Sequence, residues 1–161
     1  MLALKQDAIE MDELCISKKR NLWLWTAVSR YTGQLLAFVV GDRTWDNVAR
    51  LWRRVPQAWQ RRLVYTDGYG AYAAFFSPWQ HRPCQKFDGG TTTVEGVNHS
   101  LRHHSLRHRC GALVRRTSAR CRSHELLQKR LQITVEAHNR AGHQRFKRRL
   151  RRQQKPTRKK R

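Results

Sequence analysis

Three short apolar runs follow one another early in the chain, with only turn-like residues between them. The runs occupy residues 8–17, 21–29 and 34–40, and they are separated by KKR at residues 18–20 and YTG at residues 31–33. Runs of this length that are rich in Val, Leu, Ile and Trp are typical of β-strands. Connections this short join consecutive strands in antiparallel pairs. The sequence therefore predicts an antiparallel meander of three strands.

An amphipathic helix and a fourth strand come next. Apolar residues recur at i, i+3, i+4 and i+7 from Val48 to Val55, after a capping residue at Thr44 and before Pro56. The segment RRLVYTDGY at residues 61–69 then predicts a strand. Because a helix crosses over between them, this strand should lie parallel to the first one.

The remaining elements complete a mixed sheet flanked by helices. The segment at residues 70–76 predicts a short helix, and residues 81–88 predict an edge strand because proline limits its pairing. A further helix should begin near residue 93, and apolar spacing around residues 126–138 predicts a C-terminal helix. We expect an α/β fold with a five-stranded sheet in one domain, residues 1–142, followed by a mobile basic tail, residues 143–161.

The charge of the chain identifies its class of partner. Its 161 residues include 34 Lys and Arg against 11 Asp and Glu, a formal net charge of +23. The charges on a surface this basic repel one another unless the surface binds a polyanion, so DNA or RNA is the expected partner. An anionic membrane is the rival, but no apolar run approaches the roughly 18 residues of a membrane-spanning helix. The N-terminus carries acid too early for a secretory signal, so we expect a soluble intracellular protein with no membrane partner.

Three carboxylates stand in this basic background: Asp12 in the first strand, Asp67 at the end of the fourth, and Glu95 in the helix after it. If the two strands are neighbours, Asp12 and Asp67 come close enough to hold Mg²⁺ or Mn²⁺, which prefer oxygen ligands. Such a site performs phosphoryl displacement on nucleic acid. Taken singly, each acid could instead be structural, and Asp67 could merely open a turn. Glu13 should point to the opposite strand face from Asp12, which leaves it as a spare.

The residues leave two other functions open. A non-catalytic nucleic-acid-binding protein would explain the charge, although it has no need of three carboxylates in a basic field. A nuclease with the same metal chemistry is the other possibility. It would cut nucleic acid without joining the cut strand to another, so its products would distinguish it.

Five segments together carry a resemblance that covers residues 9–140. They are MDELC, NLWLWTAVSRYTGQLLAFVVGDRT, VYTDGYGAY, VEGVNHSLR and HRCGALVRRTS, in this order. The chain resembles the catalytic half of transposases of the Insertion Sequence 1 family, the InsB type. The resemblance implies an RNase H-like fold and a DDE transposase, in which Asp12, Asp67 and Glu95 bind the metal. The interval from Asp67 to Glu95, 95 − 67 = 28 positions, agrees with this family.

The resemblance also implies an activity and partners. Such enzymes cut DNA at the ends of a mobile element and join the freed 3′-OH to target DNA, in the bacterial cytoplasm at the nucleoid. They commonly work with an upstream zinc-finger and helix-turn-helix segment, which nothing in this sequence resembles, and we expect a homo-oligomer on DNA. This chain alone should therefore lack most sequence specificity. After Thr117 the chain departs from the serine-rich basic segment usual in the family.

Basic and polar residues after Glu95 are candidates for DNA contacts. Three of them lie at i+3, i+4 and i+7 from Glu95 and should share its helix face, where they would grip phosphates, although a merely solvated face is the alternative. Others lie in the arginine-rich stretch further on. The candidate DNA-binding residues are Asn98, His99, Arg102, Arg109, Arg115 and Arg116.

A direct repeat interrupts this region. The pentapeptide HSLRH occupies residues 99–103 and again residues 104–108. With one copy removed the sequence fits the family pattern better, so we interpret the repeat as a local duplication. Five extra helical residues rotate all later residues of the helix by about 500°, which leaves them roughly 140° out of phase. We expect this copy of the enzyme to be impaired.

Overall fold

The computed structural model describes residues 7–85, 88–103 and 124–153. The first three strands are β1 (Ile9–Ser17), β2 (Leu22–Ser29) and β3 (Leu35–Gly41). β2 pairs antiparallel with both β1 and β3, which confirms the predicted meander. The turn between β2 and β3 contains Gly33 at a φ of 67°, a left-handed conformation that glycine adopts without steric cost.

The fourth strand returns beside the first. Helix α1 (Trp45–Arg54) leads over to β4 (Val64–Thr66), which pairs parallel with β1 as predicted. Helix α2 (Gly70–Phe75) then precedes β5 (His81–Pro83), which pairs parallel with β4. The strand order is β3-β2-β1-β4-β5, so β5 is the edge strand that the proline predicted.

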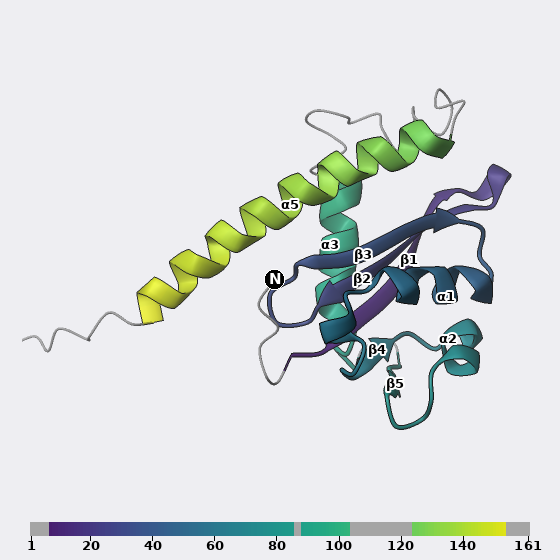
Figure 1. The fold of residues 1–161 in the computed structure, drawn as a ribbon, viewed down its shortest axis with the longest axis horizontal. Coiled ribbons are helices and arrows are strands. Elements are labelled where there is room, and N and C mark those ends of the chain that lie inside the picture. Colours follow the sequence, from purple (N-terminus) through teal and green to yellow (C-terminus); the bar gives the residue numbers. More distant parts are fainter. Residues whose placement is uncertain (1–6, 86–87, 104–123, 154–161) are drawn as a thin grey trace, which may run out of the picture.

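The described residues contain two further helices, α3 (Thr92–His103) and α5 (His124–Gln153). One apolar core lies between the sheet and helices α3 and α5, and another lies between the sheet and helices α1 and α2. Figure 1 shows α5 running obliquely above α3 and β3, with α1 and α2 on the other side of the sheet. This is the RNase H-like arrangement, and it confirms the predicted α/β fold class with its mixed five-stranded sheet and C-terminal helix.

Strand β1 divides its side chains between these two cores. Leu14 and Ile16 pack in the core beneath α3 and α5, whereas Ile9 and Met11 pack in the core beneath α1. Successive strand residues point to opposite faces, so Asp12 shares the α3 side with Leu14. The strand thereby delivers one of its acids toward the helix that carries Glu95.

Helix α5 extends further than the sequence suggested. The composition after Gly142 predicted a mobile tail from residue 143, but the helix continues to Gln153. Arg, Lys, Gln and Leu are good helix formers, and the segment has them in abundance. Phe146 also packs edge-on against Tyr31 at a centroid distance of 5.8 Å, which fixes the helix to the β2–β3 turn. Residues 154–161 of the predicted tail lie outside the described part of the chain.

Candidate active site

The pairing of β1 with β4 brings two predicted site residues together. The register joins Ile9 to Val64 and Glu10 to Tyr65. Two further steps along both strands place Asp67 beside Asp12. Asp67 comes directly after the end of β4, where its Oδ1 accepts a 3.0 Å hydrogen bond from the backbone amide of Tyr69.

Asp12 is held from the other side by helix α3. The side-chain amide of Asn98 donates a 2.7 Å hydrogen bond to Oδ2 of Asp12, while the hydroxyl of Thr26 donates to Oδ1 of Asn98 at 3.0 Å. Burial raises the pKa of Asp12 to about 6, and the negative charges of Asp67 and Glu95 add to the rise while the bond from Asn98 opposes it. The carboxylate is therefore largely desolvated, and other carboxylates rather than cations dominate its electrostatic surroundings.

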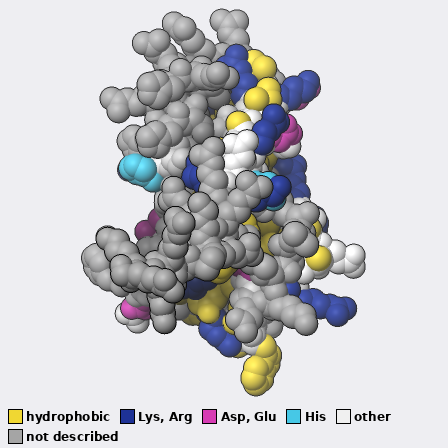
Figure 2. Space-filling model, turned by 90° about the vertical axis from the view of Figure 1, so that its left-hand side faces the viewer, with side chains coloured by type: hydrophobic (Ala, Val, Ile, Leu, Met, Phe, Trp, Pro, Cys, Tyr) yellow, Lys and Arg dark blue, Asp and Glu magenta, His cyan; other side chains and the backbone are white. Residues whose placement is uncertain are grey.

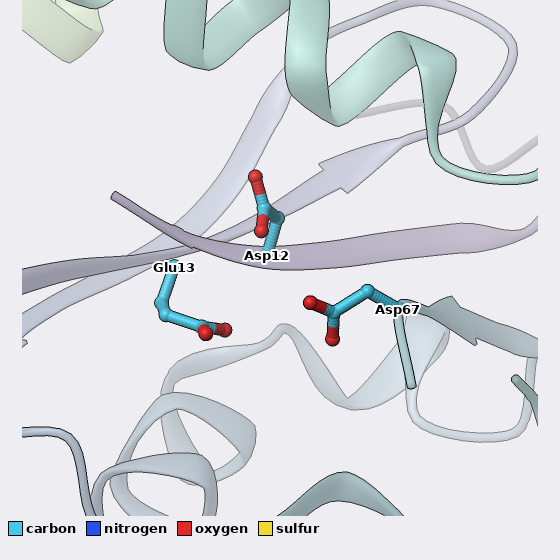
Figure 3. A group of neighbouring side chains, drawn as sticks. All are labelled: Asp12, Glu13 and Asp67. Carbon is cyan, nitrogen blue, oxygen red and sulfur yellow. The ribbon is translucent and has the colours of Figure 1, made fainter. Parts of the chain in front are cut away.

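A third carboxylate, that of Glu13, reaches the same place. One oxygen each of Asp12, Glu13 and Asp67 lies within 4.8 Å of the others. Figure 3 shows Glu13 leaving β1 on the face opposite Asp12, with its carboxylate turned toward that of Asp67. Glu13 does point to the opposite strand face, as predicted, but it is not remote from the other acids, because the carboxylate of Asp67, just beyond the end of β4, lies near both side chains.

The contacts of Glu13 differ from those of Asp12. Its Oε1 accepts bonds from Nε and Nη2 of Arg43 at 3.0 and 2.7 Å, and its Oε2 accepts a 2.9 Å bond from the hydroxyl of Tyr72. Burial raises the pKa of Glu13, and the bonds from Arg43 and Tyr72 oppose that rise. The alternation of strand faces concealed this residue from sequence reasoning, and its place next to Asp12 was the only signal for it.

Glu95 lies at the margin of this group. It is an exposed residue in the first turn of α3, and its Oε1 accepts a 2.8 Å bond from the hydroxyl of Thr91. It stands one helical turn before Asn98, and its charge contributes to the raised pKa of Asp12. It is not among the carboxylates whose oxygens lie within 4.8 Å of one another.

The predicted DNA contacts fall into three groups. Asn98 is only 4% exposed and is engaged by Thr26 and Asp12, so the structure makes it a support for the acids and contradicts a contact with phosphate. His99 is exposed on α3, and Arg102 belongs to the same helix. Arg109, Arg115 and Arg116 lie outside the described residues, as does the second copy of the HSLRH repeat.

Basic side chains predominate on part of the described surface. Figure 2 shows Lys and Arg side chains on one face of the molecule, with few Asp or Glu among the coloured residues. Within the described ranges, no helix is long and apolar enough to cross a membrane.

The carboxylates converge in a partly buried position. They supply the oxygen ligands that hard divalent cations prefer. Asp12, Asp67 and the nearby Glu13 and Glu95 are the residues that could hold such a cation. The donor set contains oxygen alone. Burial is the main cause of the raised pKa of Asp12, and the repulsion from Asp67 and Glu95 that adds to it is what a cation would relieve.

Comparison with known proteins gives this geometry a family. No curated protein sequence matches the chain. The family described as IS1 transposase matches residues 8–141, which span both strands of the acid pair, the helix that carries Glu95 and the first half of α5. The match extends over most of the chain and includes every described residue of the site, so this protein belongs to the IS1 transposase family.

Proposed function

We propose that this transposase cleaves DNA strands at the ends of its insertion sequence and transfers the resulting 3′-OH into target DNA, with Mg²⁺ or Mn²⁺ as cofactor. The observation that carries the proposal is the meeting of Asp12 and Asp67 from two parallel strands, with further carboxylates beside them. Divalent metal use follows from the DDE character of the family. Both reaction steps are phosphoryl displacements that differ only in their nucleophile.

We assign the metal-binding role to Asp12, Asp67 and Glu95. A bound divalent cation supplies activation of the attacking water or 3′-hydroxyl and stabilisation of the leaving oxygen. Asp12 is oriented by the Asn98 amide, and Asp67 is oriented by the Tyr69 backbone amide. Glu95 is exposed, its Oε1 accepts a hydrogen bond from the hydroxyl of Thr91, and its charge contributes to the raised pKa of Asp12, which supports its assignment as the third ligand.

Glu13 has a different role in this proposal. Both of its oxygens are engaged, one by Arg43 and the other by Tyr72. A carboxylate neutralised by an arginine is a weaker ligand for a metal ion, because the ion pair at 2.7 Å already balances its negative charge. We therefore assign Glu13 to holding Arg43 in place.

DNA binding rests on the charge of the chain. The net charge of +23 supports sequence-independent attraction to phosphates, and His99, Arg102, Arg109, Arg115 and Arg116 are the proposed contacts. We further propose that an upstream zinc-finger and helix-turn-helix segment supplies recognition of the element ends, and that the enzyme assembles on DNA as a homo-oligomer.

The test compares single substitutions of the acids. Asp12→Asn, Asp67→Asn and Glu95→Gln should each abolish Mn²⁺-dependent nicking of plasmid DNA and reduce the Mn²⁺-induced rise in melting temperature. Glu13→Gln should keep part of both responses. Glu125→Gln is the matched control, because Glu125 is an exposed acid on α5 that pairs with Lys129. Retained nicking by Asp67→Asn would refute the assignment.

Joining is tested separately from cutting. A duplex that already carries a free 3′-OH end should be inserted into a plasmid by the wild-type protein in the presence of Mn²⁺. Cleavage without any joined product would instead identify a nuclease, and DNA binding without either product would identify a non-catalytic binder.

A further inference from the structure

Arg43 is held in an unusual setting beside the acids. Its guanidinium carbon lies 4.8 Å from the ring centroid of Trp23 and 4.3 Å from that of Tyr69. Trp23 belongs to β2, whereas Tyr69 lies in the loop after β4, two residues beyond Asp67. Two separate elements thus supply aromatic faces to one cation, and each such contact is favourable.

Hydrogen bonds orient this side chain further. Nε and Nη2 both donate to Oε1 of Glu13. The Tyr69 hydroxyl donates to the backbone carbonyl of Arg43 at 3.0 Å, which holds the Tyr69 ring beside the guanidinium. The side chain is nevertheless 40% exposed. Among the described residues, Nη1 has no hydrogen-bond partner. A guanidinium that is oriented by two aromatic rings and one carboxylate, and that keeps one nitrogen open to solvent, is preorganised to bind a ligand.

The position of Arg43 indicates what that ligand is. Its partner Glu13 lies within 4.8 Å of Asp12 and Asp67, so the open guanidinium edge stands at the rim of the acid cluster. Arg is the side chain best suited to phosphate, because its fork of donors matches the phosphate oxygens. Neutralisation of Glu13 by itself requires neither two aromatic faces nor an exposed donor.

The neighbouring hairpin extends the same basic surface. Lys18, Lys19 and Arg20 are exposed at the turn between β1 and β2, three positions or more before Trp23. Strand geometry places this turn about 16 Å from Glu13, which corresponds to roughly five base pairs of duplex length. Cations separated by this distance fit a polyanion rather than a single small anion.

We propose that Arg43 binds a backbone phosphate of the DNA strand that enters the acid cluster, and that Glu13, Trp23 and Tyr69 are positioning residues for it. The inference rests on the proposed function, because it takes the acids as the point of strand cleavage. It adds a phosphate-binding group on the α1 side of β1, opposite the helix that carries Glu95.

The test measures the affinity for a short duplex of unrelated sequence over a range of salt concentrations, with EDTA present so that no cleavage occurs. Arg43→Ala should weaken binding roughly tenfold at low salt and reduce the slope of log affinity against log salt by about one. Arg53→Ala is the matched control, because Arg53 is an exposed arginine on α1 about 12 Å further along the helix axis than Trp45. It should change both quantities much less.

Arg43→Lys separates charge from geometry and keeps a cation for Glu13 if the alanine variant unfolds. Lysine should retain the salt slope but lose affinity, because a single ammonium cannot reproduce the fork. Equal affinity and equal slope for Arg43→Ala, Arg43→Lys and Arg53→Ala would overturn the proposal, even if the wild-type enzyme cuts and joins DNA. A wild-type protein that binds with the predicted Arg43 dependence but never cleaves would instead overturn the proposed function alone.

Discussion

The side-chain amide of Asn98 donates a 2.7 Å hydrogen bond to the carboxylate of Asp12, which ties the central strand of the sheet to the helix that carries Glu95. The two residues are 86 positions apart in the chain. This bond joins the first acid to the helix that carries the third, and its removal should have a measurable effect.

Asn98→Ala should lower the free energy of unfolding by about 1–3 kcal/mol, because the buried hydroxyl of Thr26 and the carboxylate of Asp12 both lose a partner. The same change should reduce Mn²⁺-dependent nicking. Urea denaturation and a nicking assay measure the two effects. Lys129→Ala serves as the control, since its exposed pair with Glu125 contributes well under about 1 kcal/mol. A variant as stable and active as this control would show that the bond has no positioning role.

The acid cluster should make the metal-free protein less stable as pH rises. The pKa of Asp12 is raised to about 6 in the folded state, above its ordinary value of 3.8. A raised pKa means that the stabilising contribution of Asp12 is complete below about pH 4 and is lost as pH rises through about 6. Asp12→Asn should therefore melt at a higher temperature than the wild type at pH 8 in EDTA, with a gain of up to about 3 kcal/mol. The difference should vanish near pH 4, and thermal unfolding at several pH values measures it. An Asn variant that melts lower at pH 8 would contradict a raised pKa for Asp12.

Metal binding should show the opposite pH dependence. Asp12 must lose its proton before it binds a cation, so the affinity for Mn²⁺ should fall as pH drops below about 6. Calorimetric titration with Mn²⁺ at pH 5 and pH 7.5 measures this change. Affinity that stays constant between these values would exclude Asp12 as a ligand.

Glu10 anchors the start of α3 and offers a matched pair of variants. Its fully buried carboxylate accepts a 2.8 Å bond from the backbone amide of Val94 and lies 3.4 Å from Nε of Arg30. Glu10→Gln keeps an acceptor for Val94 but loses the charge that Arg30 faces, whereas Glu10→Ala loses both. We expect the alanine variant to be less stable than the glutamine variant by about 1–2 kcal/mol, as measured by urea denaturation. Equal stability would show that the cap on α3 contributes nothing.

The duplication of the HSLRH segment should impair the enzyme. Deletion of residues 104–108 should raise strand-transfer activity, because it returns the residues beyond the repeat to their original rotation. A strand-transfer assay on the parent and the deletion variant, at matched protein stability, checks this. Equal activity in the two proteins would refute the idea that the duplication disturbs the site.

Much of the fold follows from local patterns in the sequence. Short apolar runs and their turns predict β1, β2 and β3, and the spacing from Val48 to Val55 predicts α1, because secondary structure depends on residues that are near in sequence. The scarcity of acid in a chain of net charge +23 draws attention to each carboxylate, and the resemblance to the family assigns the site to Asp12, Asp67 and Glu95. The parallel pairing of β4 with β1 is also predictable, because a strand that follows a crossover helix usually runs parallel to the strand it pairs with.

The sequence determined which elements form and which acids lie on neighbouring strands, Asp12 within β1 and Asp67 just after β4. Only the tertiary structure decided how side chains from different elements meet. Because β4 ends beside Asp12, the carboxylate of Asp67 lies near that of Glu13 as well. The packing of α3 buries Asn98 against Asp12. The contact of Phe146 with Tyr31 fixes α5 beyond the point where composition suggested its end. The physical reason is that these contacts depend on strand register and on helix packing across the sheet, which join residues far apart in the chain and leave no periodic signal in the sequence.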